Sequence, residues 1–393
     1  MLNKIFRSRR SKANFVSFFD SFISKSSSKV LFVIKDRTCY SGNIRISLES
    51  FVKKSNYKIY FYKDGKIENE IILELKSLGV CVLDGFNLKT IWHILTSGLV
   101  ILSHNPRDAH LTKRHHQRKI INLWHGVAIK KIELLMPNIP QNKLLLLKNN
   151  SKLYDIIIAS SQEDRKTNAK AFGIDMSKVI LTGLPRYEIL KEKYHLSLML
   201  EKQKKNILNF KQDKKLILYA PTFRENEKSA ILQITQNEWK KIEHIMIEEN
   251  AIFVIRPHPY DIQYLPKAIS NNPNFFLFSN EDFTEANLIL KYTDLLVVDF
   301  SSIWIDYLLL KRPIVGFSKD YTTYLTEERG FIYNFDSIFP TTFTNNIDDM
   351  LKNIIKYLNI KNIEYEKPIK LFHEYNINTD YSENIYKKII SNL

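Results

Sequence analysis

The sequence predicts an α/β protein with two Rossmann-like halves around one cleft, each half built on a parallel sheet. Short apolar runs alternate with segments of helical periodicity along most of the chain, which is the pattern of parallel sheets covered by helices on both faces. A Lys- and Gln-rich stretch without a strand pattern interrupts this alternation at residues 191–215. The length of 393 residues is also typical of two or three domains.

The first half of the chain alternates as far as residue 190. Apolar runs predict strands at 29–35, 57–62, 80–83, 99–103, 120–124, 154–160 and 179–182. Residues that recur with the period of a helix predict helices at 43–54, 68–78 and 162–172.

The second half repeats the pattern. Its expected strands are 216–220, 251–256, 275–278, 295–298 and 314–316, and its expected helices are 237–249, 284–291, 301–310, 347–358 and 380–390. We therefore divide the chain into a leader (1–28), an N-terminal domain (29–190), a linker (191–215), a C-terminal domain (216–375) and a last helical segment (376–393). One arrangement open to residues 376–393 is that this helical segment packs back on the N-terminal domain.

Several common motifs are missing. No two of the ten glycines are closer than six positions, so neither a Walker A loop nor a dinucleotide fingerprint can form. No HExxH or DxD sequence occurs, and we therefore expect chemistry without a metal or other cofactor. Cys39 and Cys81 form no CxxC pair or disulfide framework, as expected in a reducing cytoplasm.

The formal net charge of +16 favours an anionic partner such as a nucleic acid, a membrane surface or a phosphorylated substrate; a Lys-rich compositional bias would also raise it. The leader contributes cations at Lys4, Arg7, Arg9, Arg10 and Lys12, then apolar residues at helical spacing at Phe15, Phe18, Phe19, Phe22 and Ile23. Such a basic amphipathic helix either lies in a membrane interface or packs on the N-terminal domain. No secretory signal or 20-residue apolar span occurs, so we expect a cytoplasmic protein with peripheral contact to the inner face of the membrane.

Polar residues follow the predicted strands, where parallel sheets bind ligands. His125 ends the run NLWHG and is a candidate general base, because its ordinary pKa lies near neutrality. Arg256 and His258 in RPHP are each followed by proline, which restricts the backbone and suits them to a phosphate. For each motif the alternative is a purely structural role.

Further strand ends carry hydroxyls, cations and a carboxylate. Asp299 precedes Ser301 and Ser302 at the start of a predicted helix, where hydroxyls and backbone amides favour an anion. The weaker candidates are Thr222, Arg224, Arg329, Lys130 and Arg186. The run 106–119 has three histidines and five Lys or Arg against one Asp, so it is either a solvated loop or a clamp for an anionic acceptor or lipid head group.

In this order the motifs resemble the CDP-glycerol glycerophosphotransferase family of teichoic-acid and capsule synthesis. The matching pieces are WHG at 124–126 with Lys130, the Ser-Ser-helix-Gly pattern at 160–173, TGLPR at 182–186, YAPTFR at 219–224, RPHP at 256–259, the block 293–317 and ERG at 328–330. They span residues 123–340, and their order is as specific as each motif.

The resemblance implies a GT-B-like fold with an N-terminal acceptor domain and a C-terminal domain that binds the donor CDP-glycerol. A hydroxyl of a glycan, lipid-linked or polyol-phosphate acceptor would attack the β-phosphate and release CMP. The family's two essential histidines map onto His125 and His258. Phosphoryl transfer mainly requires positioning and charge stabilisation.

Three alternatives stay open. CDP-ribitol is a second possible donor, and a GT-B glycosyltransferase using a nucleotide sugar would have a similar site but release CDP from a CDP-linked donor. Nucleic-acid binding is disfavoured, because no helix-turn-helix, zinc-finger or RNP-type motif occurs and the basic residues are mostly dispersed.

Overall fold

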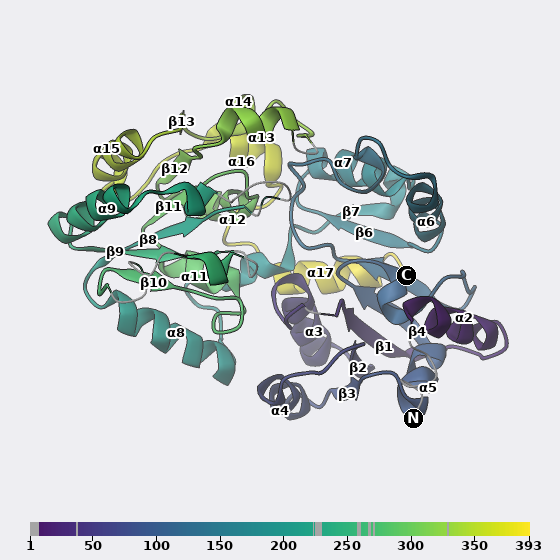
Figure 1. The fold of residues 1–393 in the computed structure, drawn as a ribbon. Coiled ribbons are helices and arrows are strands. Elements are labelled where there is room, and N and C mark those ends of the chain that lie inside the picture. The colour runs from purple at the N-terminus through teal and green to yellow at the C-terminus, as the bar shows by residue number, and fades with distance from the viewer. Residues whose placement is uncertain are drawn as a thin grey trace. The chain divides into compact units, whose positions relative to one another are not determined.

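The chain folds into two compact units (Figure 1). The computed structural model describes residues 8–36, 38–222, 224, 230–257, 261–265, 269, 272–327 and 330–393. Unit 1 comprises Met1–Val127, Ile132–Glu188 and His373–Leu393, and unit 2 comprises Ala128–Lys131 and Ile189–Phe372.

Unit 1 contains a seven-stranded parallel sheet in the order β3-β2-β1-β4-β5-β6-β7. The strands are β1 (Ser26–Ile34), β2 (Lys58–Lys63), β3 (Cys81–Asp84), β4 (Ser97–Leu102), β5 (Lys119–Asn122), β6 (Ile156–Ala159) and β7 (Val179–Leu181). The helices are α2 (Arg9–Asp20), α3 (Gly42–Lys54), α4 (Asn69–Ser77), α5 (Leu88–Thr96), α6 (Gln141–Ser151), α7 (Gln162–Phe172) and α17 (Tyr381–Ile390).

Both faces of this sheet are buried, which explains the unbroken apolar run in β1. Leu31 and Val33 join a core cluster with Val16 of α2 and Ile91 of α5. On the alternate face, the Phe32 ring lies 5.6 Å from that of Phe51 in α3. The strand order reverses between β1 and β4, so their carboxyl ends define the crevice where doubly wound sheets bind ligands.

The last helix, α17, packs against α3 (Figure 1). Ser50 donates a hydrogen bond of 2.6 Å to the carbonyl of Ser382, and the Phe51 and Tyr386 rings lie 5.1 Å apart. Gly183, in the TGLPR motif, has φ of +68°, and a Cβ there would lie 2.4 Å from the Tyr381 ring. The glycine is therefore required both by its backbone conformation and by the close approach of α17.

Unit 2 contains a six-stranded parallel sheet in the order β10-β9-β8-β11-β12-β13. The strands are β8 (Lys215–Ala220), β9 (Ala251–Ile255), β10 (Phe275–Leu277), β11 (Leu295–Val298), β12 (Ile314–Phe317) and β13 (Phe343–Thr344). The helices are α8 (Leu198–Lys211), α9 (Gln236–Glu248), α11 (Ala286–Tyr292), α12 (Ile303–Leu308), α13 (Tyr321–Glu327), α14 (Phe335–Ile338), α15 (Ile347–Tyr357) and α16 (Glu366–Phe372). Helices α9 and α15 cover one face, and α8 and α11 lie on the other (Figure 1).

The predicted class, α/β with two parallel sheets, is confirmed. Several helices differ from the prediction. Residues 191–215 contain α8, which belongs to unit 2 and buries Leu200, Gln203 and Ile207. Helix α12 is six residues long and shorter than the predicted 301–310. Helices α5, α6, α13, α14 and α16 and the two-residue strand β13 had not been predicted.

The leader forms a docked helix whose predicted apolar stripe is not its buried face. In α2, Ser8 caps the first turn in a capping box with Ser11, and the buried positions are Ala13, Val16, Ser17 and Asp20. Phe15 and Ile23 pack partly on the core, whereas the side chains of Phe18 and Phe22 are 65% and 78% exposed. The helix therefore docks through one face and presents aromatic rings on another.

Candidate active site

His125 follows β5 in a turn that two asparagine side chains fix. The Asn122 Oδ1 accepts a 2.8 Å bond from the Trp124 N–H. Asn43 of α3 donates from Nδ2 to the carbonyls of Leu123 and Trp124, both at 3.0 Å. These bonds hold Trp124 at a φ of +49°, a conformation that costs a bulky residue on the order of 1–3 kcal/mol. As a whole residue, His125 is exposed at this turn.

The contacts of the His125 imidazole indicate which of its two nitrogens carries the proton. Its Nδ1 lies 3.5 Å from the Ser103 carbonyl oxygen, which can only accept, so this contact favours the tautomer with the proton on Nδ1 and the lone pair on Nε2. The surrounding protein desolvates the ring, and the charges of Arg186 and Lys35 add to this effect; together they lower its pKa to about 4. A neutral imidazole with a free Nε2 is the form that a general base requires.

Arg186, from the segment after β7, reaches the same turn. Its Nη1 donates a 2.7 Å hydrogen bond to the carbonyl of His125, and its backbone N–H donates to Asn43 Oδ1 at 3.2 Å. Gly126 has φ of +153°, and a Cβ there would lie 3.2 Å from Nη2 of Arg186. The glycine of the WHG motif therefore leaves room for the guanidinium.

In unit 2, three predicted residues form one buried network at the reversal between β8 and β11. Asp299, which is fully buried, accepts from the backbone N–H of Thr222 at 2.9 Å and from its hydroxyl at 2.7 Å. Arg224 donates to Asp299 at 3.0 Å and to Asp320, which follows β12, at 2.6 Å. Burial alone would lower the pKa of Arg224, but the bonds to Asp320 and Asp299 outweigh it and raise the pKa.

This network fixes three strand-end loops, those after β8, β11 and β12, relative to one another and uses most of the Arg224 donors internally. The Arg224 guanidinium also lies over the Tyr324 ring, 4.3 Å from its centroid. Ser301 and Ser302 lie beside this network and are half-buried. Ser302 is the N-cap of α12, but its side chain makes no capping hydrogen bond, so its hydroxyl is not used by the helix.

The remaining predicted residues lie as follows. Arg256 follows β9 and donates a 2.9 Å hydrogen bond to the Phe283 carbonyl. Lys130 pairs through its backbone with Phe331, and its ammonium lies 5.2 Å from the Tyr324 ring centroid. His258 and Arg329 lie outside the described residues, as do Lys4 and Arg7. The structure thus brings Thr222, Arg224 and Asp299 together in unit 2, and His125 and Arg186 in unit 1.

Sequence reasoning missed His104, Ser103, Asn43, Lys35 and Asp320. His104 follows β4, and its ring stacks on that of His125 with centroids 4.6 Å apart and planes 16° from parallel. The signal was available, since His104 directly follows the predicted strand 99–103, which precedes the predicted strand that leads to His125.

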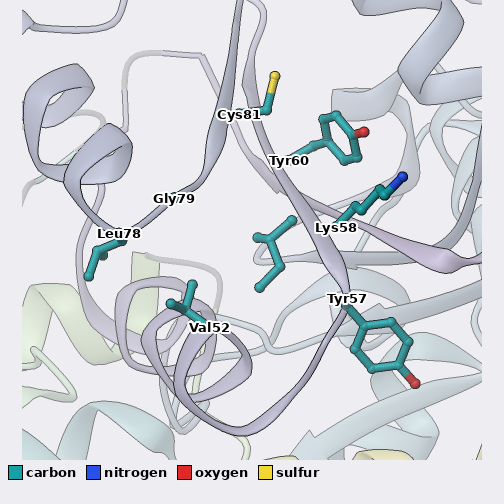
Figure 2. A pocket seen from close by; sticks show the side chains of 8 residues that line it. Val52, Tyr57, Lys58, Tyr60, Leu78, Gly79 and Cys81 are labelled. Carbon is teal, nitrogen blue, oxygen red and sulfur yellow. The ribbon is translucent and has the colours of Figure 1, made fainter.

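A separate cavity of about 380 Å³ lies at the opposite, amino-terminal edge of the unit 1 sheet. Figure 2 shows its lining side chains, among them Val52 of α3, Leu78 after α4 and Tyr57 and Lys58 at the start of β2. Ligands of doubly wound sheets bind at carboxyl ends, so this cavity is not part of the candidate site.

No three His, Cys, Asp or Glu side chains in the part of the chain that the structure describes gather closely enough to hold a metal ion. Among its helices, none combines the length and apolar character that crossing a bilayer demands.

The two doubly wound parallel sheets, with polar residues at their carboxyl ends, place the protein in the GT-B-like class of α/β proteins. The wall teichoic acid polymerase TagF has the same fold, with a TM-score of 0.78 at 18% sequence identity over 100% of this chain and 96% of that chain. The model of the family described as CDP-Glycerol:Poly(glycerophosphate) glycerophosphotransferase matches residues 15–391. The chain belongs to this family, as the motifs had indicated.

Curated relatives include both glycerol and ribitol enzymes. A teichoic acid poly(ribitol-phosphate) polymerase of Bacillus spizizenii is 27% identical over 340 residues, which cover 84% of this chain and 51% of the relative. A teichoic acid poly(glycerol phosphate) polymerase of the same organism is 28% identical over 293 residues, covering 71% of each. The chain spans about half the length of the first of these relatives.

Proposed function

We propose that the protein transfers glycerol phosphate from CDP-glycerol to a hydroxyl of a glycan or polyol-phosphate acceptor and releases CMP, in teichoic-acid or capsular polysaccharide synthesis. The observation that carries the proposal is the family match across residues 15–391. The orientation of His125, whose Nε2 keeps its lone pair at a strand end, supports it.

In the proposed reaction the acceptor hydroxyl oxygen forms a bond to the β-phosphorus of the donor. The bond between that phosphorus and the oxygen bridging to the α-phosphate breaks, and the oxygen leaves with CMP. His125 Nε2 takes the proton of the attacking hydroxyl. The Ser103 carbonyl stabilises the imidazolium that results, because it accepts from the opposite nitrogen.

We assign donor binding to unit 2. Arg256, His258 and the Ser301 and Ser302 hydroxyls would stabilise the diphosphate and the departing CMP, with Lys130 and Arg329 as further cations. Asp299, Thr222 and Arg224 hold these loops in place, since their polar atoms bond mainly to one another. This role replaces direct phosphate contact as our proposal for Arg224.

The test is CMP release from CDP-glycerol by His125→Ala and His258→Ala variants. Each loss should lower kcat by roughly 10²–10⁴-fold, the usual contribution of a positioned acid or base, with unchanged circular dichroism. The control is His244→Ala, an exposed histidine on α9. Near-normal turnover in either active-site variant would refute the assignment.

CDP-ribitol is the second candidate donor, because curated relatives of similar identity include a poly(ribitol-phosphate) polymerase. Incubation with each CDP-polyol and mass spectrometry of the products decides between them. Release of CDP in place of CMP would instead indicate glycosyl transfer.

We further propose peripheral contact with the inner face of the membrane through an aromatic surface consisting of Phe18, Phe22, Leu88 and Trp92. Helices α2 and α5 pack side by side, and these four side chains are 54–78% exposed. Each large apolar side chain that becomes fully buried gains roughly 1.5–3 kcal/mol.

The charge around this surface suits anionic lipid. The single acid of α2, Asp20, is buried between Lys25 at 3.0 Å and Arg118 at 2.7 Å. The exposed cations Arg10 and Lys89 lie on the same two helices, α2 and α5, and each cation near an anionic surface contributes about 1 kcal/mol.

Sedimentation with vesicles of mixed anionic and zwitterionic lipid tests this contact. A Phe18→Ser, Phe22→Ser, Trp92→Ser variant should lose binding, whereas Leu198→Ser, which changes a 92% exposed leucine on α8, should retain it. Equal binding by both variants would refute the proposal.

A further inference from the structure

Lys35 and His104 lie together at the crevice of the unit 1 sheet. Strands β1 and β4 are the neighbours between which the strand order reverses, and Val33 pairs with Leu102 in their parallel register. Two residues beyond this pair, the chain reaches Lys35 on one side and His104 on the other. Neither residue is assigned a substrate contact in the function proposed above, although the charge of Lys35 helps to lower the pKa of His125.

The His104 ring is fixed on several sides. Its Nδ1 lies 2.9 Å from the Ser103 hydroxyl, and its face stacks on His125. The backbone carbonyl of His104 accepts hydrogen bonds from the Asn122 side-chain amide at 2.9 Å and from the Tyr154 hydroxyl at 3.3 Å. Within the described part of the chain, Nε2 of His104 makes no hydrogen bond, and it is not enclosed away from solvent.

With the Ser103 hydroxyl donating to Nδ1, one of the two directions that this contact allows, Nε2 of His104 is a hydrogen-bond donor. When the Ser103 hydroxyl donates to Nδ1, the neutral ring carries its proton on Nε2. Burial, the neighbouring His125 and the charge of Lys35 lower the pKa of His104 to about 3, so the neutral form predominates at neutral pH. A neutral N–H donor without a protein partner suits an acceptor-only group such as phosphate.

Lys35 supplies a positive charge at the same place. Its side chain is exposed, and it forms no ion pair within the residues that the structure describes. Arg186 is a second cation that acts on His125. The carboxylates facing this region are Asp36, directly after Lys35, and Asp108, which is buried 3.8 Å from Arg9.

We propose that Lys35 and His104 bind a phosphate group of the acceptor, next to the hydroxyl that His125 deprotonates. This inference rests on the proposed function and names its acceptor class, a chain ending in a polyol phosphate. The His104 and His125 ring centroids lie 4.6 Å apart, a separation within the span of the three-carbon backbone that joins the phosphate and terminal hydroxyl of glycerol phosphate.

A kinetic test compares two acceptors that differ only in the terminal phosphate, one ending in glycerol phosphate and one in glycerol. Lys35→Ala and His104→Ala should each raise KM for the phosphate acceptor by about tenfold or more relative to KM for the glycerol acceptor, the value of one charge-assisted hydrogen bond. Lys58→Ala, at the opposite edge of the same sheet, is the matched control.

A binding test does not depend on turnover. In histidine NMR titrations with glycerol 3-phosphate alone, the wild-type His104 signal should shift and its pKa should rise, because a bound anion favours the charged ring. The Lys35→Ala protein should show a weaker response. His104→Asn serves as a second variant should the alanine variant fail to fold.

The outcomes separate the two proposals. Equal KM effects on both acceptors, or no response to glycerol 3-phosphate, would overturn the phosphate site while leaving the transferase proposal standing. No CMP release with either acceptor, together with a normal glycerol 3-phosphate response, would instead contradict the transferase proposal.

Discussion

Replacing Asn43 by alanine should both destabilise unit 1 and displace His125. The Asn43 side chain is 4% exposed and makes three hydrogen bonds, two to the carbonyls of Leu123 and Trp124 and one from the N–H of Arg186. At a net contribution of about 1 kcal/mol each, their loss should cost about 3 kcal/mol. For a unit of about 200 residues this corresponds to a fall in Tm of roughly 6–12 °C.

The same change should affect catalysis beyond its effect on stability. Without the two Asn43 donors, the strained Trp124 conformation can relax, and the Ser103 carbonyl then no longer fixes the His125 tautomer. We expect kcat to fall at least tenfold and the acid limb of the pH–rate profile to move toward the ordinary histidine pKa of about 6.5.

Calorimetry and CMP release at temperatures well below Tm would measure both effects. The matched control is Asn168→Ala in α7, which removes one buried hydrogen bond to the Ile158 carbonyl at 3.2 Å and should lower Tm without moving the pH profile. An Asn43→Ala enzyme with wild-type kcat and pH profile would refute the idea that this side chain sets the His125 turn.

Three further predictions follow from the electrostatics. Because the pKa of His125 is lowered to about 4, its base form should persist as pH falls from 8 to near 5, so kcat/KM should stay flat over that range; an acid limb centred at pH 6.5 or above would contradict this. Arg224→Met leaves Asp299 and Asp320 buried without their shared cation and should cost about 3–5 kcal/mol of unfolding free energy, measured by urea titration; a loss below 1 kcal/mol would show the network to be dispensable. Because the sequence lacks the DxD and HExxH motifs, EDTA should leave CMP release unchanged, and activity restored only by added Mg²⁺ or Mn²⁺ would disprove this.

The parallel sheets could be predicted from sequence because their strands are buried on both faces. Runs such as VLFVI in β1 or LLVV in β11 have no polar position to obscure them. The helices were harder to predict. Helix α8 lies in a Lys- and Gln-rich stretch with only three buried positions, and the apolar residues of α6 are partly exposed, so neither shows a clean amphipathic period.

The candidate site could be located from strand ends but not fully assembled. His125 and Asp299 follow obvious strands, whereas Asn43 reaches the site from a helix 80 residues earlier in the chain. A single sequence carries no signal for such a contact. Arg224 was predicted to bind phosphate because cations that follow strands commonly do so. Its carboxylate partner Asp320 lies 96 residues further along the chain, so the sequence did not indicate the ion pair.

The return of α17 to the α3 surface has a consequence for biosynthesis. During translation the whole of unit 2 emerges from the ribosome before the Tyr381–Ile390 segment does. In the folded protein the Tyr381 N–H of this segment donates a 2.8 Å hydrogen bond to the Glu188 carboxylate of unit 1. Until the segment emerges, Phe51 and Ser50 lack their partners on the nascent chain. Unit 1 therefore completes its fold only after translation has passed residue 390, and removal of α17 should destabilise the half of the protein made first.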